Sequence, residues 1–471
     1  MMTEPRMTGD PHLPTRPAVW RVVPLAVLFA FVLTDALLAS QQMDGASDDF
    51  WPQWTLAHLA ATGHGADSYD FQTQAQLLRD LGVPPHRLEL LKMPQIKDIG
   101  ISPYPPTFVL LYAPICRLPF NDAALTVYFA TLVLALIAAT AINRATGERL
   151  TGLPAAIALP TWSGVHSAVM IYDGTWLKLI LAALALFVVA AVVFGGVGGR
   201  PASWFVAAIA ILCFAGVGTT LHLGQNALLT LCVLALGWQD LVRRRDLAAG
   251  LWWGLLAYKV HWLLAVGWVP LAIGRPRVVL GMAASAGAFA LAATAFLGPE
   301  AWGRWLWQAA ALDHASATDP FFREYLLIMG CDLRSVLHRY IEWPTVARTA
   351  GWAALAAVAL VTAVWYRRRP GADPAGREGA GLMFASGLTA AHVYYYDETV
   401  FLLPLLILWS YRPVLRRWQM ATLIALTAAY YFAARYVVVW APAFEGPPLQ
   451  TFTALALWLL SLTVQSEESR A

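Results

Sequence analysis

Charged side chains are scarce in this sequence. Only 13% of its 471 residues are Asp, Glu, Lys or Arg, whereas a soluble globular domain carries roughly 25%. The chain therefore has too few charged groups to cover a surface that faces water on all sides. Because 59% of the residues are hydrophobic and the mean hydropathy is +0.57, the composition predicts an all-α polytopic membrane protein.

Cysteine and net charge are also low. The four cysteines form no CxxC pair, so we expect free thiols rather than a structural metal site. A net charge of +3 indicates no nucleic-acid surface. No small-residue cleavage site precedes Asp44, so we interpret the first apolar run, 18–39, as an uncleaved span.

No internal repeat is evident, which argues against a transporter built from inverted repeats. The apolar runs predict roughly 10–13 membrane segments, since a helical crossing takes about 20 residues. We expect a cytoplasmic tail over 1–17, one transmembrane domain over 18–465 and a polar tail over 466–471. Two longer loops, 40–105 and 298–345, interrupt the apolar segments.

The distribution of arginine predicts the topology. Arg6 and Arg16 precede the first span, and an acidic stretch follows it. Basic flanks stay cytoplasmic, so the acidic stretch and both long loops should face outward.

The acidic stretch has two interpretations. Asp44, Asp48 and Asp49 directly follow the first span, and Phe50 and Trp51 come next. The cluster is either a solvated loop with an interfacial aromatic anchor or an active site. In the second case a carboxylate takes a proton from a hydroxyl while an aromatic ring stacks on a sugar or a lipid.

The rest of the first long loop predicts two short helices. The stretches WPQWTLAHLAATG and FQTQAQLLRDLG have helical apolar spacing, and we expect amphipathic helices lying on the outer membrane surface. The loop ends at Tyr104-Pro105-Pro106, where consecutive prolines set how the chain re-enters the membrane.

Two later segments are too short for two crossings. Arginines at 243–245 and at 275 and 277 are separated by about 26 residues, whereas two crossings need about 40. Either one tilted span crosses here, or a re-entrant pair places Lys259 at its tip. A lysine at membrane depth is either functional or snorkels to an end. A second hairpin would carry Tyr396 and Asp397 at its tip.

These motifs together resemble glycosyltransferase family 87. The resemblance covers about 48–404, and its matching residues are Asp49-Phe50, Gly63, Tyr69-Asp70, Tyr104-Pro105-Pro106, Gly224-Gln225, Gly250, Gly254, Lys259 and Tyr396-Asp397. Members of that family often have proline after the hairpin lysine, where this chain has Val260 and His261.

The resemblance implies a GT-C-type helical bundle in the cytoplasmic membrane. Its members transfer a sugar from a polyprenyl phosphate to a lipid or glycan at the outer face. The resemblance implies Asp49 as general base, with Asp48 as second choice, and an inverting reaction. Mannose is the default sugar, and arabinofuranose, glucose and galactose stay open.

The remaining expectations concern binding. A cation should meet the leaving phosphate, and the candidates are Lys259, His314, Arg323 and His261. Further substrate contacts are expected from Trp51, Tyr104, Gln225, Tyr396 and Asp397. We expect no metal or other cofactor, because a phosphate-linked donor lacks the diphosphate that usually demands one.

Two other functions are compatible with the sequence. A flippase or transporter of lipid-linked sugars would share the buried polar groups, but it would need no acidic group in an outer loop. A non-catalytic membrane subunit of an envelope-assembly complex would keep the fold without the activity.

Overall fold

The computed structural model describes residues 50–81, 100, 104–147, 210–211, 214, 217, 220, 224–320, 330–369, 371–394, 396–440 and 449–464. Several sequence predictions concern residues outside these ranges. They are the first span, the carboxylates Asp44, Asp48 and Asp49, and Arg323.

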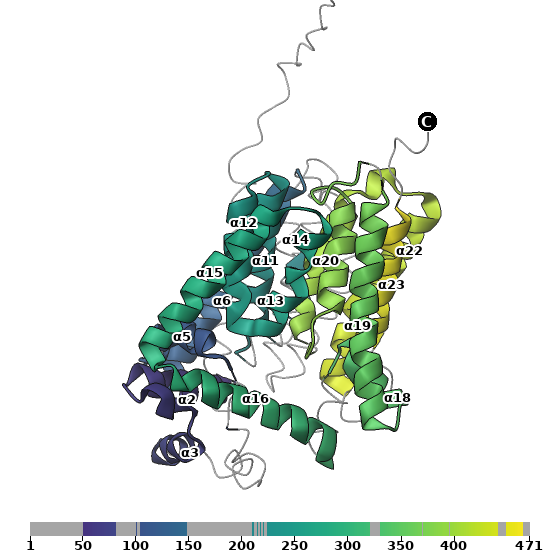
Figure 1. Ribbon diagram of the computed structural model, residues 1–471. Helices are drawn as coiled ribbons and strands as arrows, with labels where there is room; N and C mark the ends of the chain where they lie inside the picture. The colour runs from purple at the N-terminus through teal and green to yellow at the C-terminus, as the bar shows by residue number, and fades with distance from the viewer. Residues whose placement is uncertain are drawn as a thin grey trace, which may run out of the picture.

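The described residues confirm an all-α membrane protein. Their regular elements are helices, and their one extended pairing is an isolated bridge between Gly330 and Tyr394. Four segments are long and apolar enough to cross a membrane. Figure 1 shows most helices side by side, with α16 (Glu300–Thr318) lying across one end of the bundle.

Three of these four segments are single long helices. They are α6 (Phe120–Ala145), α15 (Pro276–Leu297) and α19 (Pro344–Arg367). Proline begins α15 and α19, where its missing N–H breaks no helical hydrogen bond. Leu291 of α15 is 72% exposed, as expected for a side chain that faces lipid.

The fourth segment, Asp246–Ala272, turns back on itself. It contains α12 (Asp246–Gly254), the 3-10 turn η3 (Leu255–Lys259), α13 (Val260–Gly267) and α14 (Val269–Ala272). Arg275, just after α14, forms a 3.0 Å ion pair with Asp246 and donates to the carbonyl of Leu241 at 3.0 Å. The two ends of the segment therefore meet. Of the two alternatives that the sequence left open, the structure has the re-entrant pair.

A second hairpin has the same course. It consists of α20 (Glu378–Leu388), the turn η4 (Asp397–Phe401) and α21 (Leu402–Ser410). The Tyr411 hydroxyl, at its end, donates to the carbonyl of Ala375, before its start, at 3.4 Å. The two hairpins touch where Trp268 Nε1 donates to Thr389 Oγ1 at 3.1 Å. Every residue of α20 and α21 is buried, which explains why both helices are apolar on all sides.

Glycine allows α12 and α15 to pack at backbone contact. A Cβ added to Gly250 would lie 2.1 Å from the carbonyl oxygen of Val278, and one added to Gly281 would lie 2.4 Å from that of Leu247. Only hydrogen at these Cα atoms permits the observed helix separation, as in other membrane helix pairs with small residues at the interface.

The first long loop contains two helices, as the sequence predicts, but only one of them buries a single face, as an amphipathic helix does. The helix α3 (Phe71–Asp80) buries one face, and Asp70 caps it by accepting from Thr73 N at 2.8 Å. The helix α2 (Phe50–Ala61) is instead packed into the bundle, where Trp51 stacks on Phe120 of α6 at 3.5 Å. The prediction of an amphipathic helix was wrong for α2, because its polar residues Gln53 and Thr55 are buried as well.

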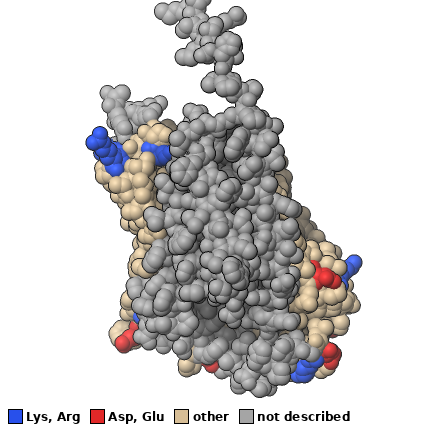
Figure 2. Space-filling model, turned by 180° about the vertical axis from the view of Figure 1, so that it is seen from behind, with Lys and Arg blue, Asp and Glu red and all other residues tan. Residues whose placement is uncertain are grey.

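The charges gather at two ends of the bundle. At one end, which we call the basic end, Arg244 and Arg275 lie 3.3 and 3.8 Å from Asp373, and Arg367 donates to Leu271 O. At the opposite end, which we call the α16 end, Arg304 pairs with Asp67 at 2.9 Å. Figure 2 shows few charged side chains among the described residues between these ends.

The remaining helices complete the bundle around the hairpins. They are α5 (Pro106–Cys116), α11 (Ala227–Val242), α18 (Leu333–Tyr340), α22 (Arg417–Trp440) and α23 (Leu449–Thr463). The three described cysteines, Cys116, Cys232 and Cys331, are free and buried, which confirms the expectation for them.

The contact between α12 and α15 leads to a prediction about stability. We expect Gly250→Ala to destabilise the protein by about 1–3 kcal/mol, because the new methyl group meets the α15 backbone. The control is Gly287→Ala on α15, where a Cβ meets nothing within 4 Å. Thermal unfolding in detergent should show a lower Tm for Gly250→Ala alone. Equal Tm values for the two variants would contradict the close contact.

Candidate active site at the tips of the two hairpins

A buried ion pair joins the two hairpin tips. Lys259 ends η3 with φ −139°, which breaks the helical path. Its Nζ lies 2.5 Å from Asp397 Oδ1 at the start of η4. The Tyr396 ring lies beside the ammonium, with its centroid 5.7 Å from Nζ. Lys259 therefore does not snorkel to an end, because its charge is neutralised inside the bundle.

Burial makes each partner depend on the other. The Lys259 side chain is 7% exposed and that of Asp397 is fully buried. A lone charge at such a position is strongly unfavourable, and removal of one partner of a buried pair typically costs about 3–5 kcal/mol. The pair thus holds η3 against η4, although the two segments are 138 residues apart in sequence.

Tyr258 connects the first tip to the start of α11. Its hydroxyl lies 2.5 Å from Thr230 Oγ1 and donates to the carbonyl of Asn226 at 3.4 Å. Thr230 Oγ1 also donates to that carbonyl at 3.3 Å. The backbone that leads into α11 is therefore held next to η3.

The turn before α11 brings in the first long loop. Gly224 has φ +66°, and a Cβ there would lie 2.7 Å from the Cβ of Phe50. Both observations require glycine. The next residue, Gln225, accepts from the Tyr104 hydroxyl at 3.4 Å. The residues of three separate sequence motifs are in contact here.

Hydrogen bonds to the backbone position Tyr104 and the proline pair after it. The Tyr69 hydroxyl donates to the carbonyl of Tyr104 at 2.8 Å. Burial raises the pKa of Tyr69 well above its usual value, so its hydroxyl keeps the proton that it donates. Gln308 of α16 donates to Tyr69 O at 2.7 Å, and Thr107 of α5 donates to Ala257 O of η3 at 2.7 Å.

Several polar atoms around this pair are buried without a hydrogen-bond partner. Within the part of the chain that the structure describes, they include Asp397 Oδ2, His261 Nε2 and both side-chain polar atoms of Asn226. Such atoms are rare in folded proteins, and each calls for an explanation, such as strain, a catalytic role or a bound water or ion.

The structure brings together most of the predicted site residues that it describes. Lys259, Asp397, Tyr396, His261, Gln225 and Tyr104 lie at or next to the hairpin tips. Trp51 packs on Phe120 with one face of its ring. His314 is exposed near the end of α16, and no contact between described residues joins it to the Lys259 pair.

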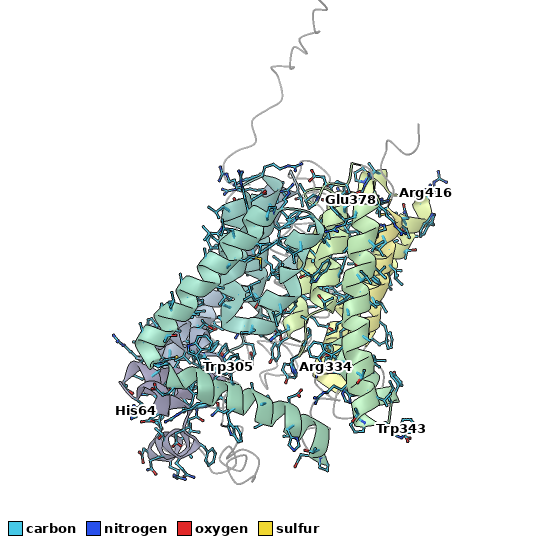
Figure 3. All side chains as sticks on the ribbon, in the orientation of Figure 1. His64, Trp305, Arg334, Trp343, Glu378 and Arg416 are labelled. Atoms are coloured by element: carbon cyan, nitrogen blue, oxygen red, sulfur yellow. The ribbon has the colours of Figure 1, made fainter. Side chains whose placement is uncertain are left out.

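Sequence reasoning missed Tyr258, Asn226 and Arg334. Asn226 directly follows the Gly224-Gln225 motif, and a carboxamide at the start of a span was a usable signal. Arg334, in the first turn of α18, is buried over the Trp352 ring at 4.4 Å and lies 3.5 Å from Asp313. Figure 3 shows it toward the α16 end, far from Glu378 and Arg416 at the basic end. No pattern marked this arginine in the sequence.

Comparison with known proteins gives one family match. No curated protein and no solved structure gives a significant match. The family model described as glycosyltransferase family 87 matches residues 167–390. This range contains Gln225, Asn226 and Lys259, and it ends seven residues before Asp397 (397 − 390). Over these 224 of its 471 residues (390 − 167 + 1), the chain is similar to glycosyltransferase family 87.

Proposed function

We propose that this membrane glycosyltransferase moves a hexosyl group, by default mannosyl, from a polyprenyl phosphate to a lipid or glycan acceptor. The observation that carries the proposal is the buried Lys259–Asp397 pair at the meeting point of two re-entrant hairpins. Tyr258, next to Lys259, bonds to Asn226, and Asn226 follows Gln225, which accepts from Tyr104. A cation and hydroxyl-binding groups among apolar helices suit a donor that has both a phosphate-linked sugar and a long hydrocarbon chain.

The depth of the site supports transfer at the outer face. From Asp246 to Lys259 the chain makes nine residues of α-helix and five of 3-10 helix, which extend at most about 24 Å. The hydrocarbon core is about 30 Å thick. With the hairpin perpendicular to the membrane and entering from the basic end, this length would place Lys259 in the far half of the hydrocarbon core.

The charge distribution supports the same orientation. The basic end carries Arg244, Arg275 and Arg367, and the positive-inside rule assigns such an end to the cytoplasm. The α16 end, with α2 and α3, then faces outward. The protein would lie in a bacterial-type cytoplasmic membrane with its N-terminus inside.

The proposed general base is Asp49. It directly precedes Phe50, whose side chain lies against Gly224 beside the Tyr104–Gln225 contact. In the proposed step Asp49 takes the proton of the acceptor hydroxyl while the acceptor oxygen attacks the anomeric carbon. The bond from that carbon to the phosphate oxygen breaks, polyprenyl phosphate leaves, and the configuration at the anomeric carbon is inverted.

We expect Asp49→Asn to lower kcat about 10²–10⁴-fold, the usual contribution of a general base. The matched control is Asp48→Asn. Its kcat should stay within about tenfold of the parent's, a smaller loss than removal of a general base causes. The measurement is transfer of labelled sugar from a synthetic polyprenyl phosphate donor to membrane lipids. Full activity of Asp49→Asn would remove Asp49 from the mechanism.

Lys259 is the proposed cation for the leaving phosphate. An ammonium has three N–H donors, and Asp397 Oδ1 accepts one of them. Two donors then remain for phosphate oxygens, on which charge grows as the bond breaks. Asp397 keeps the flexible lysine side chain directed into the site.

Two variants separate this role from a purely structural one. Lys259→Met should lower both stability and kcat, because it leaves the Asp397 carboxylate buried and unpaired. In Lys259→Met/Asp397→Asn no charge is stranded, so Tm should recover while kcat stays at least about 10²-fold low, as for loss of a donor to developing charge. Recovery of kcat together with Tm would show that the pair only holds the hairpins.

We also propose that transfer is metal-independent. Among the described residues, no group of three His, Cys, Asp or Glu side chains is arranged to hold a metal ion. Addition of a chelator to the purified enzyme should leave the initial rate unchanged. Loss of activity on chelation, restored by Mg²⁺ or Mn²⁺, would contradict this proposal.

A further inference from the structure

The side chain of Asn226 makes no hydrogen bond to the other described residues. Asn226 is 2% exposed, and neither its amide nitrogen nor its amide oxygen has a hydrogen-bond partner among the described residues. It occupies the N-cap of α11, where asparagine normally accepts from a free backbone N–H. Here the side chain makes no capping bond.

The backbone carbonyl of Asn226, not its side chain, makes the hydrogen bonds that hold the local structure. Its carbonyl accepts from Tyr258 and from Thr230, and these bonds hold α11 against η3. A leucine would leave both bonds in place. The amide is therefore buried, unpartnered and unnecessary for the local fold, which indicates a group kept for a ligand.

A second unpartnered acceptor lies next to the same turn, η3. Asp397 is fully buried, and its Oδ2 has no partner among the described residues, while Oδ1 holds Lys259. Residues Tyr258 and Lys259 are adjacent in η3, and they contact Asn226 and Asp397 respectively. Asn226 and Asp397 therefore border the same turn.

We propose that the Asn226 amide and Asp397 Oδ2 bind neighbouring hydroxyl groups of the donor sugar, and that Asn226 determines which sugar is preferred. This inference rests on the proposed function. Each sugar hydroxyl both donates and accepts, and the amide offers an NH₂ and a carbonyl while the carboxylate oxygen accepts. Buried groups that bond to a hydroxyl reject an analogue in which that hydroxyl is missing or points elsewhere, because the groups are then left unpaired.

The test uses Asn226→Leu and the smaller Asn226→Ala in the full-length protein. Donors are polyprenyl phosphates that carry mannose, glucose or galactose, which differ in the direction of single hydroxyl groups. We expect the donor KM to rise about tenfold or more for the preferred sugar and the preference among the three to shrink by a similar factor. The acceptor KM should not change. The Tm of Asn226→Leu should equal or exceed that of the parent, since an unpartnered buried amide is removed.

Asn143 provides the control. Its side-chain oxygen is also buried without a partner among the described residues, near the end of α6 away from Phe120. Asn143 and Phe120 are 23 positions apart on α6, which corresponds to about 35 Å along the helix. Phe120 packs against Phe50, whose side chain lies against Gly224. Asn143→Leu should keep the parent's donor preference. If Asn143→Leu changes that preference as much as Asn226→Leu does, the inference is overturned.

Measurements of lipid binding test this inference separately from the proposed function. Asn226→Leu should weaken binding of the sugar-bearing lipid and leave binding of bare polyprenyl phosphate unchanged. Equal loss for both lipids, or a change confined to the acceptor KM, would overturn the assignment to the donor sugar. A parent enzyme that transfers sugar, with Asn226→Leu at parental KM and preference, would overturn the inference alone. A parent that transfers no sugar from any of these donors would overturn the proposed function.

Discussion

The buried ion pair between Lys259 and Asp397 is the contact on which the site depends. Neither hairpin crosses the bundle, so each ends inside it with a break in its helix. Opposite charges at the two tips make their meeting favourable, because either charge alone would be strongly unfavourable at this depth. The partners that gather around the pair, from α5, α11 and η3, then bring the first long loop to the same place.

The surrounding helices make this meeting possible by close packing. Gly250 allows α12 to lie directly on the backbone of α15, and Gly224 leaves room for Phe50. Membrane helices gain little from apolar burial against one another, since lipid is equally apolar, so contact at short range and polar bonds decide the arrangement.

Much of the architecture was predictable from local patterns. The spacing of arginines around 247–272 allowed a re-entrant pair with Lys259 at its tip, and the structure confirms it through the Arg275–Asp246 contact. The sequence also predicted a second hairpin with Tyr396 and Asp397 at its tip. The prediction for α2 was wrong, because its aromatic residues are typical of an interface but here pack on α6. Asn226 was missed although it directly follows Gly224-Gln225, because only the tertiary structure shows that its amide is buried without a partner among the described residues.

The sequence by itself determined the class of the protein, its helical segments and the residue types available for chemistry. These follow from composition and from the spacing of apolar and basic residues, which act over one or two helical turns or across one membrane thickness. Only the tertiary structure decided that Lys259 is neutralised by a residue 138 positions away, that α2 is buried, and which polar atoms stay without partners. Those outcomes depend on contacts between distant segments, and no local pattern encodes which buried group meets which.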